Sequence, residues 1–370
     1  MHILFAGGGT AGHINPALAI AGYIKEKHPN AKISYIGTAE KLESRLVPAA
    51  GYDFYPIKVS GFKRSFSPSA IMHNVKAVTE AATASLAARK LLKQLKPDVV
   101  IGTGGYVSGP VLKAAAALKI KTAIHEQNAF PGVTNKMLAT QVDRVMLAME
   151  QAEKHFKVKR KYDVTGNPVR LELSKIRKEE AKQKLGFDNR PVLLSFGGSL
   201  GARPINEAVC ELIKEYNNTK TFYHIHATGK VGYNSVMQNL GDIKLREETE
   251  LREYIDNMDV CMAAADLVVC RAGAITLSEL ALCGKPSILI PSPYVAENHQ
   301  FHNAMTLKKV GAAEIIEEKD LNGKELIKQV SYLIENKPKL AEMQEKAKKA
   351  AIPDCLDRIY RVIMELYSNV

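Results

Sequence analysis

Two glycine-rich segments in the first half of the chain have the composition of phosphate-binding loops. Residues 7–12 match Gly-x-Gly-x-x-Gly after a short apolar segment, and residues 102–110 contain four more glycines after another. Glycine lets the backbone approach a phosphate closely, and amides at a helix N-terminus attract negative charge. Two such loops favour a substrate that carries a pyrophosphate, although a tight turn that only packs a helix on a sheet has the same pattern.

His13 and Glu126 are the two candidates for a general base. His13 directly follows the first glycine loop, and an imidazole titrates near neutrality, so it can take a proton from a hydroxyl group. Glu126 lies in a polar segment, residues 125–128, that follows a predicted strand. A loop histidine often only hydrogen-bonds the backbone, so the residues alone leave this choice open.

Polar side chains also follow predicted strands in the second half of the chain. Residues 271–276 form a turn that leads into a helix, and Glu279 lies one turn inside it. A carboxylate there can accept hydrogen bonds from both ribose hydroxyls, or it can simply complement the helix dipole. Gln300 and Asn303 have amides suited to sugar hydroxyls, yet they also fit an ordinary helix start.

The elements that must position these residues alternate between short apolar strands and longer helices, as in an α/β protein with parallel sheets. We predict strands at 2–6, 32–37, 53–57, 99–102, 122–125 and 144–148, and then at 192–196, 222–227, 267–270, 287–290 and 313–316. Gly166 and Pro168 break regular structure between the two series. This predicts two Rossmann-like domains, residues 1–165 and 166–352, with a helix at about 353–370 that packs back onto the first domain.

The composition is that of a folded protein whose basic charge either favours an anionic ligand or only keeps its surface soluble. Of its 370 residues 46% are hydrophobic and 24% charged, and the formal net charge is +12. Excess basic charge attracts nucleic acid, phosphorylated substrates or acidic lipid. Five cysteines without a Cys-x-x-Cys pair argue against disulfides and a zinc site. The sequence shows neither a signal peptide nor an uninterrupted apolar run long enough to span a membrane.

Six motifs together resemble the MurG family of glycosyltransferases. They lie in the expected order at residues 7–16, 104–110, 125–128, 166–170, 197–202 and 271–279. The resemblance implies a GT-B fold and transfer of N-acetylglucosamine from its UDP derivative to the 4-hydroxyl of the muramyl sugar of a polyprenyl-pyrophosphoryl muramyl-pentapeptide. The α linkage of the donor becomes β, so the family needs a base and no covalent sugar intermediate. It implies no cofactor, and no Asp-x-Asp metal clamp is present.

The resemblance also implies site residues. The implied catalytic pair is His13 and Glu126. The implied contacts of the UDP-sugar are Thr10, Ala11, Gly12, Asn128, Arg170, Ser199, Ile255, Arg271, Ala274, Glu279, Gln300 and Asn303. The implied contacts of the acceptor pyrophosphate are Gly8, Gly9, Gly104, Gly105 and Tyr106. The family often has two adjacent glutamines where this chain has His299 and Gln300, so only Gln300 is assigned a sugar contact.

The implied location is the cytoplasmic face of the cell membrane, with an anionic lipid surface and other cell-wall synthesis proteins as partners, and no nucleic acid. Residues 60–66 with Ile71, Met72 and Val75 combine aromatic, apolar and basic side chains and are the predicted docking segment. The alternative is a loop that folds into the first domain. Competing functions are a nicotinamide dehydrogenase, for which Glu40 would be a poor ribose ligand, a glycolipid-forming transferase, a sugar-nucleotide 2-epimerase, and a protein that binds UDP without turnover.

Overall fold

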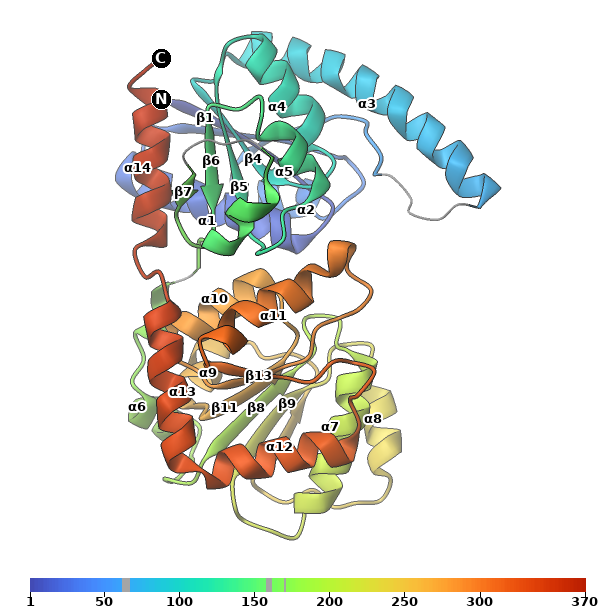
Figure 1. Ribbon diagram of the computed structural model, residues 1–370, viewed down its shortest axis with the longest axis vertical. Helices are drawn as coiled ribbons and strands as arrows, with labels where there is room; N and C mark the ends of the chain where they lie inside the picture. Colours follow the sequence, from blue (N-terminus) through green and yellow to red (C-terminus); the bar gives the residue numbers. More distant parts are fainter. Residues whose placement is uncertain (62–66, 158–161, 170) are drawn as a thin grey trace. The chain divides into compact units, whose positions relative to one another are not determined.

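The computed structural model describes residues 1–61, 67–157, 162–169 and 171–370. The chain divides into two compact units (Figure 1): unit 1 comprises Met1–Val169 with Asp354–Val370, and unit 2 comprises Arg170–Pro353. The first boundary lies four residues beyond the predicted one. Within the described residues, no helix has both the length and the apolar character needed to cross a bilayer.

Unit 1 is built on a seven-stranded parallel sheet with the order β3-β2-β1-β4-β5-β6-β7. The strands are β1 (His2–Gly7), β2 (Lys32–Gly37), β3 (Asp53–Pro56), β4 (Val99–Gly104), β5 (Lys121–Glu126), β6 (Arg144–Leu147) and β7 (Asp163–Val164). The helices are α1 (Ala11–Lys27), α2 (Glu43–Ala49), α3 (Pro68–Leu95), α4 (Ser108–Ala117), α5 (Val133–Leu138), the 3₁₀ helix η1 (Glu150–His155) and α14 (Cys355–Tyr367). All predicted strands are present, and only the two-residue β7 was missed.

Helices cover both faces of this sheet, so the central strands are buried throughout and read as continuous apolar segments. Helices α3, α4 and α5 contribute to the core on one face, and α1, α2 and α14 to the core on the other. Helix α14 carries Ile359, Val362, Ile363 and Leu366 at helical spacing, and all four are buried. It packs against α1, as Figure 1 shows.

Unit 2 repeats this plan with a six-stranded parallel sheet of order β10-β9-β8-β11-β12-β13. The strands are β8 (Val192–Phe196), β9 (Tyr223–Ala227), β10 (Thr249–Arg252), β11 (Leu267–Cys270), β12 (Ser287–Leu289) and β13 (Ala313–Ile315). The helices are η2 (Leu171–Ser174), α6 (Lys178–Lys184), α7 (Arg203–Tyr216), α8 (Tyr233–Leu240), α9 (Met258–Ala264), α10 (Ala274–Leu282), η3 (Ala296–Asn298), α11 (His299–Lys309), α12 (Gly323–Glu335) and α13 (Lys337–Ala350).

Strand β10 is, after β7, the second strand that was not predicted from the sequence. Three of its four residues are polar, including Glu250 and Arg252, because β10 lies at the edge of the sheet and pairs only with β9. Edge strands tolerate charged side chains that a central strand excludes. The apolar pattern that predicted the other strands of unit 2 is therefore weak at β10.

The strand order of each unit reverses at one point, and ligands of open α/β sheets bind at this point. In unit 1 it lies between β1 and β4, and the glycine loops at residues 7–12 and 102–110 follow these two strands. In unit 2 it lies between β8 and β11, which precede the glycine loop at 197–201 and the turn at 271–273. The topology thus brings the predicted site residues of each unit to the carboxyl edge of its sheet.

Candidate functional site

The two glycine loops of unit 1 pack directly against each other. A Cβ atom added to Gly105 would lie 2.3 Å from the carbonyl oxygen of Gly8, and Gly105 has a φ of +78°. A Cβ added to Gly104 would lie 2.7 Å from Cδ2 of His13, and one added to Gly9 would lie 3.2 Å from the ring of Tyr106. Only glycine fits at Gly104 and Gly105, so the loops and His13 form one cluster.

Ser108, the first residue of α4, fixes the second loop to the first strand. Its buried hydroxyl accepts a hydrogen bond from the amide of Gly104 at 3.1 Å and donates to the carbonyl of Ala6 at 2.7 Å. Ser108 was not among the predicted site residues, although a serine within the glycine loop, four residues after Gly104, was a usable signal.

The hydrogen bonds of His13 determine which ring nitrogen is free to act as a base. Nδ1 lies 3.0 Å from the carbonyl oxygen of Gly8 and 3.3 Å from Oγ1 of Thr10. A carbonyl oxygen only accepts, so Nδ1 carries the hydrogen and Nε2 holds the lone pair in the neutral ring. Nε2 lies on the side of Gly104, where an added Cβ would approach it to 3.1 Å. His13 is half-buried, so part of its surface remains open to solvent.

Glu126, the alternative base, has its carboxylate occupied by four donors. Oε1 accepts from the backbone and side-chain amides of Asn128 at 3.0 and 3.1 Å. Oε2 accepts from the amide of Gly132 at 3.0 Å and from Nδ2 of Asn135 at 2.8 Å. This buried carboxylate shapes the loop after β5 and with it the position of Asn128. The geometry favours His13 over Glu126 as the base.

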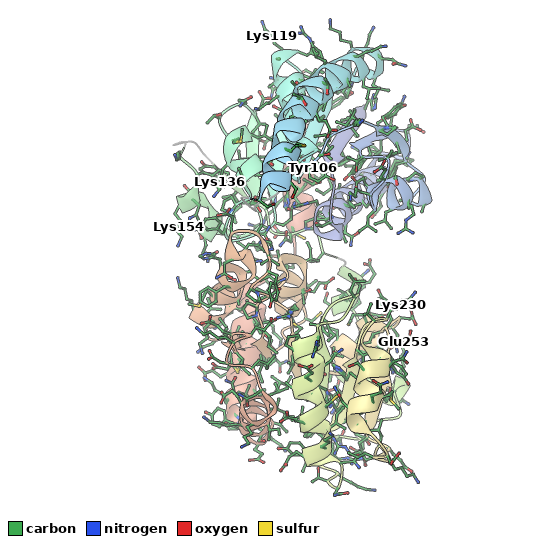
Figure 2. All side chains as sticks on the ribbon, turned by 90° about the vertical axis from the view of Figure 1, so that its right-hand side faces the viewer. Tyr106, Lys119, Lys136, Lys154, Lys230 and Glu253 are labelled. Atoms are coloured by element: carbon green, nitrogen blue, oxygen red, sulfur yellow. The ribbon has the colours of Figure 1, made fainter. Side chains whose placement is uncertain are left out.

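Tyr106 and Glu43 complete the surroundings of the loops. Tyr106, labelled in Figure 2, is half-buried, and burial raises the pKa of its phenol. Glu43 is fully buried and accepts a hydrogen bond from the amide of Gly9 at 3.2 Å. Residue spacing pointed to Glu40, which is exposed, and not to Glu43. The usable signal was a second acidic residue three positions further on, in the segment that forms α2.

In unit 2, the loops after β8, β9 and β10 lie in a row. A Cβ on Gly201 would lie 2.0 Å from the carbonyl oxygen of Thr228, and the amide of Gly229 donates to the carbonyl of Glu253 at 3.0 Å. Figure 2 labels Glu253 and the exposed Lys230 of the neighbouring loop. Ser199 is exposed in the first of these loops, and Ile255 is buried in the third. Two of the residues assigned to UDP thus belong to the outer two of these three loops, on either side of the loop after β9.

Helix α10 begins at Ala274 and carries Glu279 in its second turn. Glu279 is half-buried. It lies close enough to Cys283 to act on its thiol, whose pKa is raised to about 11, mainly by burial of the thiol and further by the charge of Glu279. Arg271, in the preceding turn, forms an ion pair with Glu318 and donates to the carbonyl of Ile290 at 3.2 Å. Its charge is therefore already compensated within unit 2, which leaves helix amides as the better candidates for a phosphate.

Gln300 and Asn303 lie on α11 and hold two neighbouring segments. Oε1 of Gln300 accepts from the amide of Ser292 at 2.8 Å, and Nδ2 of the buried Asn303 donates to the carbonyl of Ala272 at 3.3 Å. Just before α11, Glu297 and Asn298 have φ values of +52° and +49°. Such left-handed backbone at consecutive non-glycine residues is strained and is typical of binding sites.

Two further predictions concern Arg170 and a metal site. Arg170, one of the residues assigned to the UDP-sugar, lies outside the described residues. Among the described residues, no three histidine, cysteine, aspartate or glutamate side chains are grouped so that they could hold a metal ion.

Two doubly wound units with glycine loops at their switch points define the architecture of α/β proteins that bind phosphorylated ligands such as nucleotide-sugars. Models of known families match both units: the glycosyltransferase family 28 N-terminal domain matches residues 3–147, and the C-terminal domain of that family matches residues 192–359. The chain belongs to glycosyltransferase family 28.

Individual relatives agree with this assignment over the full length. The chain is 49% identical over 370 residues to the UDP-N-acetylglucosamine--N-acetylmuramyl-(pentapeptide) pyrophosphoryl-undecaprenol N-acetylglucosamine transferase of Acetivibrio thermocellus, covering 100% of this chain and 99% of the relative. It is 46% identical to the protein of that name from Ruminiclostridium cellulolyticum, covering 99% and 100%. Among solved structures, MurG of Acinetobacter baumannii matches with a TM-score of 0.80 and 29% identity, covering 98% and 99%. These matches confirm the predicted GT-B fold.

Replacing Glu279 with glutamine is expected to weaken binding of UDP and of its N-acetylglucosamine derivative by about 1.5–3 kcal/mol, the contribution of a hydrogen bond to a charged group. Isothermal titration calorimetry measures this directly. Glu335→Gln, at an exposed position of α12, is the matched control and should bind like the parent protein. Equal affinities of the two variants would refute the assignment of Glu279 to ribose.

Proposed function

We propose that this protein transfers N-acetylglucosamine from UDP-N-acetylglucosamine to the 4-hydroxyl of the muramyl sugar of undecaprenyl-pyrophosphoryl-MurNAc-pentapeptide, which converts lipid I to lipid II in peptidoglycan synthesis. The observation that carries the proposal is the 49% identity, over the full length, to the N-acetylglucosamine transferase of Acetivibrio thermocellus. The two switch-point sites support it, because each combines glycine loops with side chains suited to phosphate and sugar groups.

The proposed step is a single displacement. Nε2 of His13 takes the proton of the muramyl 4-hydroxyl, and the oxygen attacks the anomeric carbon of N-acetylglucosamine. The bond from that carbon to the β-phosphate oxygen breaks, its electron pair leaves with UDP, and the α linkage becomes β. This step requires a base for the attacking hydroxyl group and stabilisation of the departing diphosphate.

We assign the residues of this step as follows. In unit 2, Ser199, the backbone at Ile255, the N-terminus of α10 at Ala274 and Glu279 bind UDP, while Gln300 and Asn303 recognise the sugar. The amides at the start of α10 stabilise the leaving diphosphate better than Arg271 does, because Glu318 already pairs with Arg271. In unit 1, the acceptor pyrophosphate binds at Gly8, Gly9, Gly104, Gly105 and Tyr106. We also assign to the UDP-sugar four residues of unit 1, Thr10, Ala11, Gly12 and Asn128, together with Arg170.

The decisive experiment measures UDP release from UDP-N-acetylglucosamine with two acceptors. A short-chain muramyl-pentapeptide pyrophosphoryl lipid should support turnover, and a diacylglycerol should not. UDP release with the diacylglycerol alone would instead establish a glycolipid-forming transferase. Consumption of the donor without any acceptor would establish an epimerase.

We further propose that the protein acts at the cytoplasmic face of the cell membrane as a peripheral protein, with an anionic lipid surface and other cell-wall synthesis proteins as partners. A polyprenyl-linked acceptor requires a bilayer, and the net charge of +12 favours anionic lipid. Of the predicted docking segment, residues 62–66 lie outside the described residues, and Met72 at the start of α3 is 76% exposed.

The docking segment is tested by replacing Phe62, Lys63, Arg64 and Phe66 together. Sedimentation with anionic vesicles should fall for this variant, and the binding of the parent protein should weaken at high salt, because each basic residue near anionic lipid contributes about 1 kcal/mol. Neutral vesicles are the control. Undiminished, salt-insensitive binding of the variant would show that another surface is the anchor.

A further inference from the structure

Glu43 is a buried carboxylate directly behind the first glycine loop. It is the first residue of α2, and its side chain is completely excluded from solvent. Oε1 accepts hydrogen bonds from the amide and the hydroxyl of Thr38 at 3.1 and 2.7 Å, and Oε2 accepts from the amide of Gly9 at 3.2 Å. These donors are all neutral, and within the described part of the chain no lysine or arginine forms an ion pair with Glu43.

The peptide group between Gly8 and Gly9 links Glu43 to His13. The N–H of this peptide group belongs to Gly9 and donates to Glu43, while its C=O belongs to Gly8 and accepts from Nδ1 of His13 at 3.0 Å. Carboxylate, peptide and imidazole are therefore connected by two consecutive hydrogen bonds. Hydrogen bonds in such a chain polarise one another, so a negative charge at one end strengthens the acceptor at the other.

The surroundings hold this peptide group firmly. A Cβ on Gly8 would lie 2.4 Å from Oε1 of Glu43, and a Cβ on Gly105 would lie 2.3 Å from the carbonyl oxygen of Gly8. Neither face of the peptide therefore has room for a further side-chain atom. Among the described residues, the phenols of Tyr35 and Tyr106 also lie near Glu43, and burial raises the pKa of both. Both phenols are thus neutral near pH 7, and Glu43 supplies the negative charge at this place.

We propose that Glu43 is a positioning residue that acts on His13 through the Gly8–Gly9 peptide, which extends the proposed role of His13 as the base and rests on it. When Nε2 takes the proton of the acceptor hydroxyl, the ring becomes an imidazolium, and the polarised carbonyl of Gly8 stabilises its charge. The hydrogen on Nδ1 stays where it is, and no proton reaches Glu43. The same bonds keep the ring in the tautomer that exposes the lone pair of Nε2.

A purely structural role for Glu43 accounts less well for its ionisable side chain. A buried carboxylate without a cationic partner is costly, and a neutral glutamine offers an acceptor for the same loop amide at lower cost. The acidic group gains its advantage only when positive charge develops nearby, and the proposed reaction produces such a charge on His13.

The test compares pH profiles of kcat/KM for the parent protein and Glu43→Gln, with the short-chain lipid acceptor. The variant should lose about tenfold in kcat, the scale of one weakened charge-assisted hydrogen bond. Its activity should also persist to lower pH, because a less stabilised imidazolium forms only at lower pH. Affinity for UDP should change little, since Glu279 and the N-terminus of α10, which are assigned to its ribose and diphosphate, lie in unit 2.

Controls separate this effect from simple disruption of the loop. Thr38→Val removes one donor to Glu43 but keeps the charge of Glu43 and the hydrogen bond from Gly9. The acidic limb of the pH profile of this variant should therefore coincide with that of the parent protein. Glu43→Asp, which also keeps the charge, should retain that limb even if kcat falls. The double variant His13→Ala/Glu43→Gln should be no slower than His13→Ala, because Glu43 acts only through His13.

The outcomes distinguish this inference from the proposed function. An unchanged acidic limb in Glu43→Gln, or additive losses in the double variant, would overturn the role of Glu43 while leaving His13 as the base. Full activity of His13→Ala would overturn the role of His13 itself. If Glu43→Gln does not fold, as judged by circular dichroism, a shifted acidic limb in Glu43→Asp overturns the inference and an unshifted one supports it.

Discussion

Replacing His13 with alanine is expected to lower turnover by about 10²–10⁴-fold, the usual contribution of general base catalysis. The hydrogen bond from Nδ1 to the carbonyl of Gly8 leaves Nε2 as the basic nitrogen, so the variant loses the proton acceptor and keeps both glycine loops. Affinity for the UDP-sugar should stay nearly unchanged. Steady-state kinetics with calorimetry of UDP binding separates the two effects.

Glu126→Gln is the comparison that decides between the two candidate bases. Its carboxylate accepts four hydrogen bonds, so the variant should perturb the loop that carries Asn128 and reduce turnover less than His13→Ala does. If His13→Ala retains turnover and Glu126→Gln abolishes it, the two roles must be exchanged.

The stability of the protein is expected to fall as the pH drops from about 6.5 to about 4, because buried histidines cannot accept protons in the folded state. Burial lowers the pKa of His125 in unit 1 and of His226 in unit 2 to about 4. The hydrogen bonds that these rings make to the backbone offset this effect only in part.

The direction of this change in stability with pH follows from proton binding. Below pH 6.5 the unfolded chain binds protons at these histidines and the folded chain does not, so the free energy of unfolding decreases with falling pH and levels off near pH 4. Each histidine contributes a loss of about 3 kcal/mol over this range. His224 acts in the same direction, because burial also lowers its pKa; it shares the hydroxyl of Ser195 with His226.

Urea unfolding between pH 7.5 and 5 measures this loss while most carboxylates remain ionised. His226→Gln should be less stable at pH 7.5, but the slope of its stability against pH should be shallower than that of the parent protein. An unchanged slope would show that His226 is not the group that links unfolding to protons. His125→Gln provides the same test for unit 1.

The sequence predicted the strands well because central strands of a parallel sheet are buried on both faces and therefore read as apolar runs. It missed β10, where an edge position admits Glu250 and Arg252. The spacing of glycines located the loops of both units, because these loops pack so closely that a Cβ does not fit at Gly105 or Gly201.

What the sequence could not predict was the pairing of polar groups that folding brings together. Arg271 looked available for a phosphate, but Glu318 from a distant segment pairs with it. Glu126 looked like a free base, but Asn135 and Gly132 donate to it. Glu43 was not singled out at all, and only the packed loop places it behind Gly8 and Gly9. Partnerships of this kind depend on tertiary structure, which residue spacing does not encode.

The return of α14 to unit 1 has a consequence for how the protein is made. Unit 2 is continuous from Arg170 to Pro353 and has all its residues before the last helix is translated. Unit 1 starts first, yet one face of its sheet lacks Ile359 and Ile363 until α14 has left the ribosome. The nascent chain therefore completes its second unit before its first, and a premature stop codon shortly before α14 would leave a finished second unit beside an exposed apolar surface on the first.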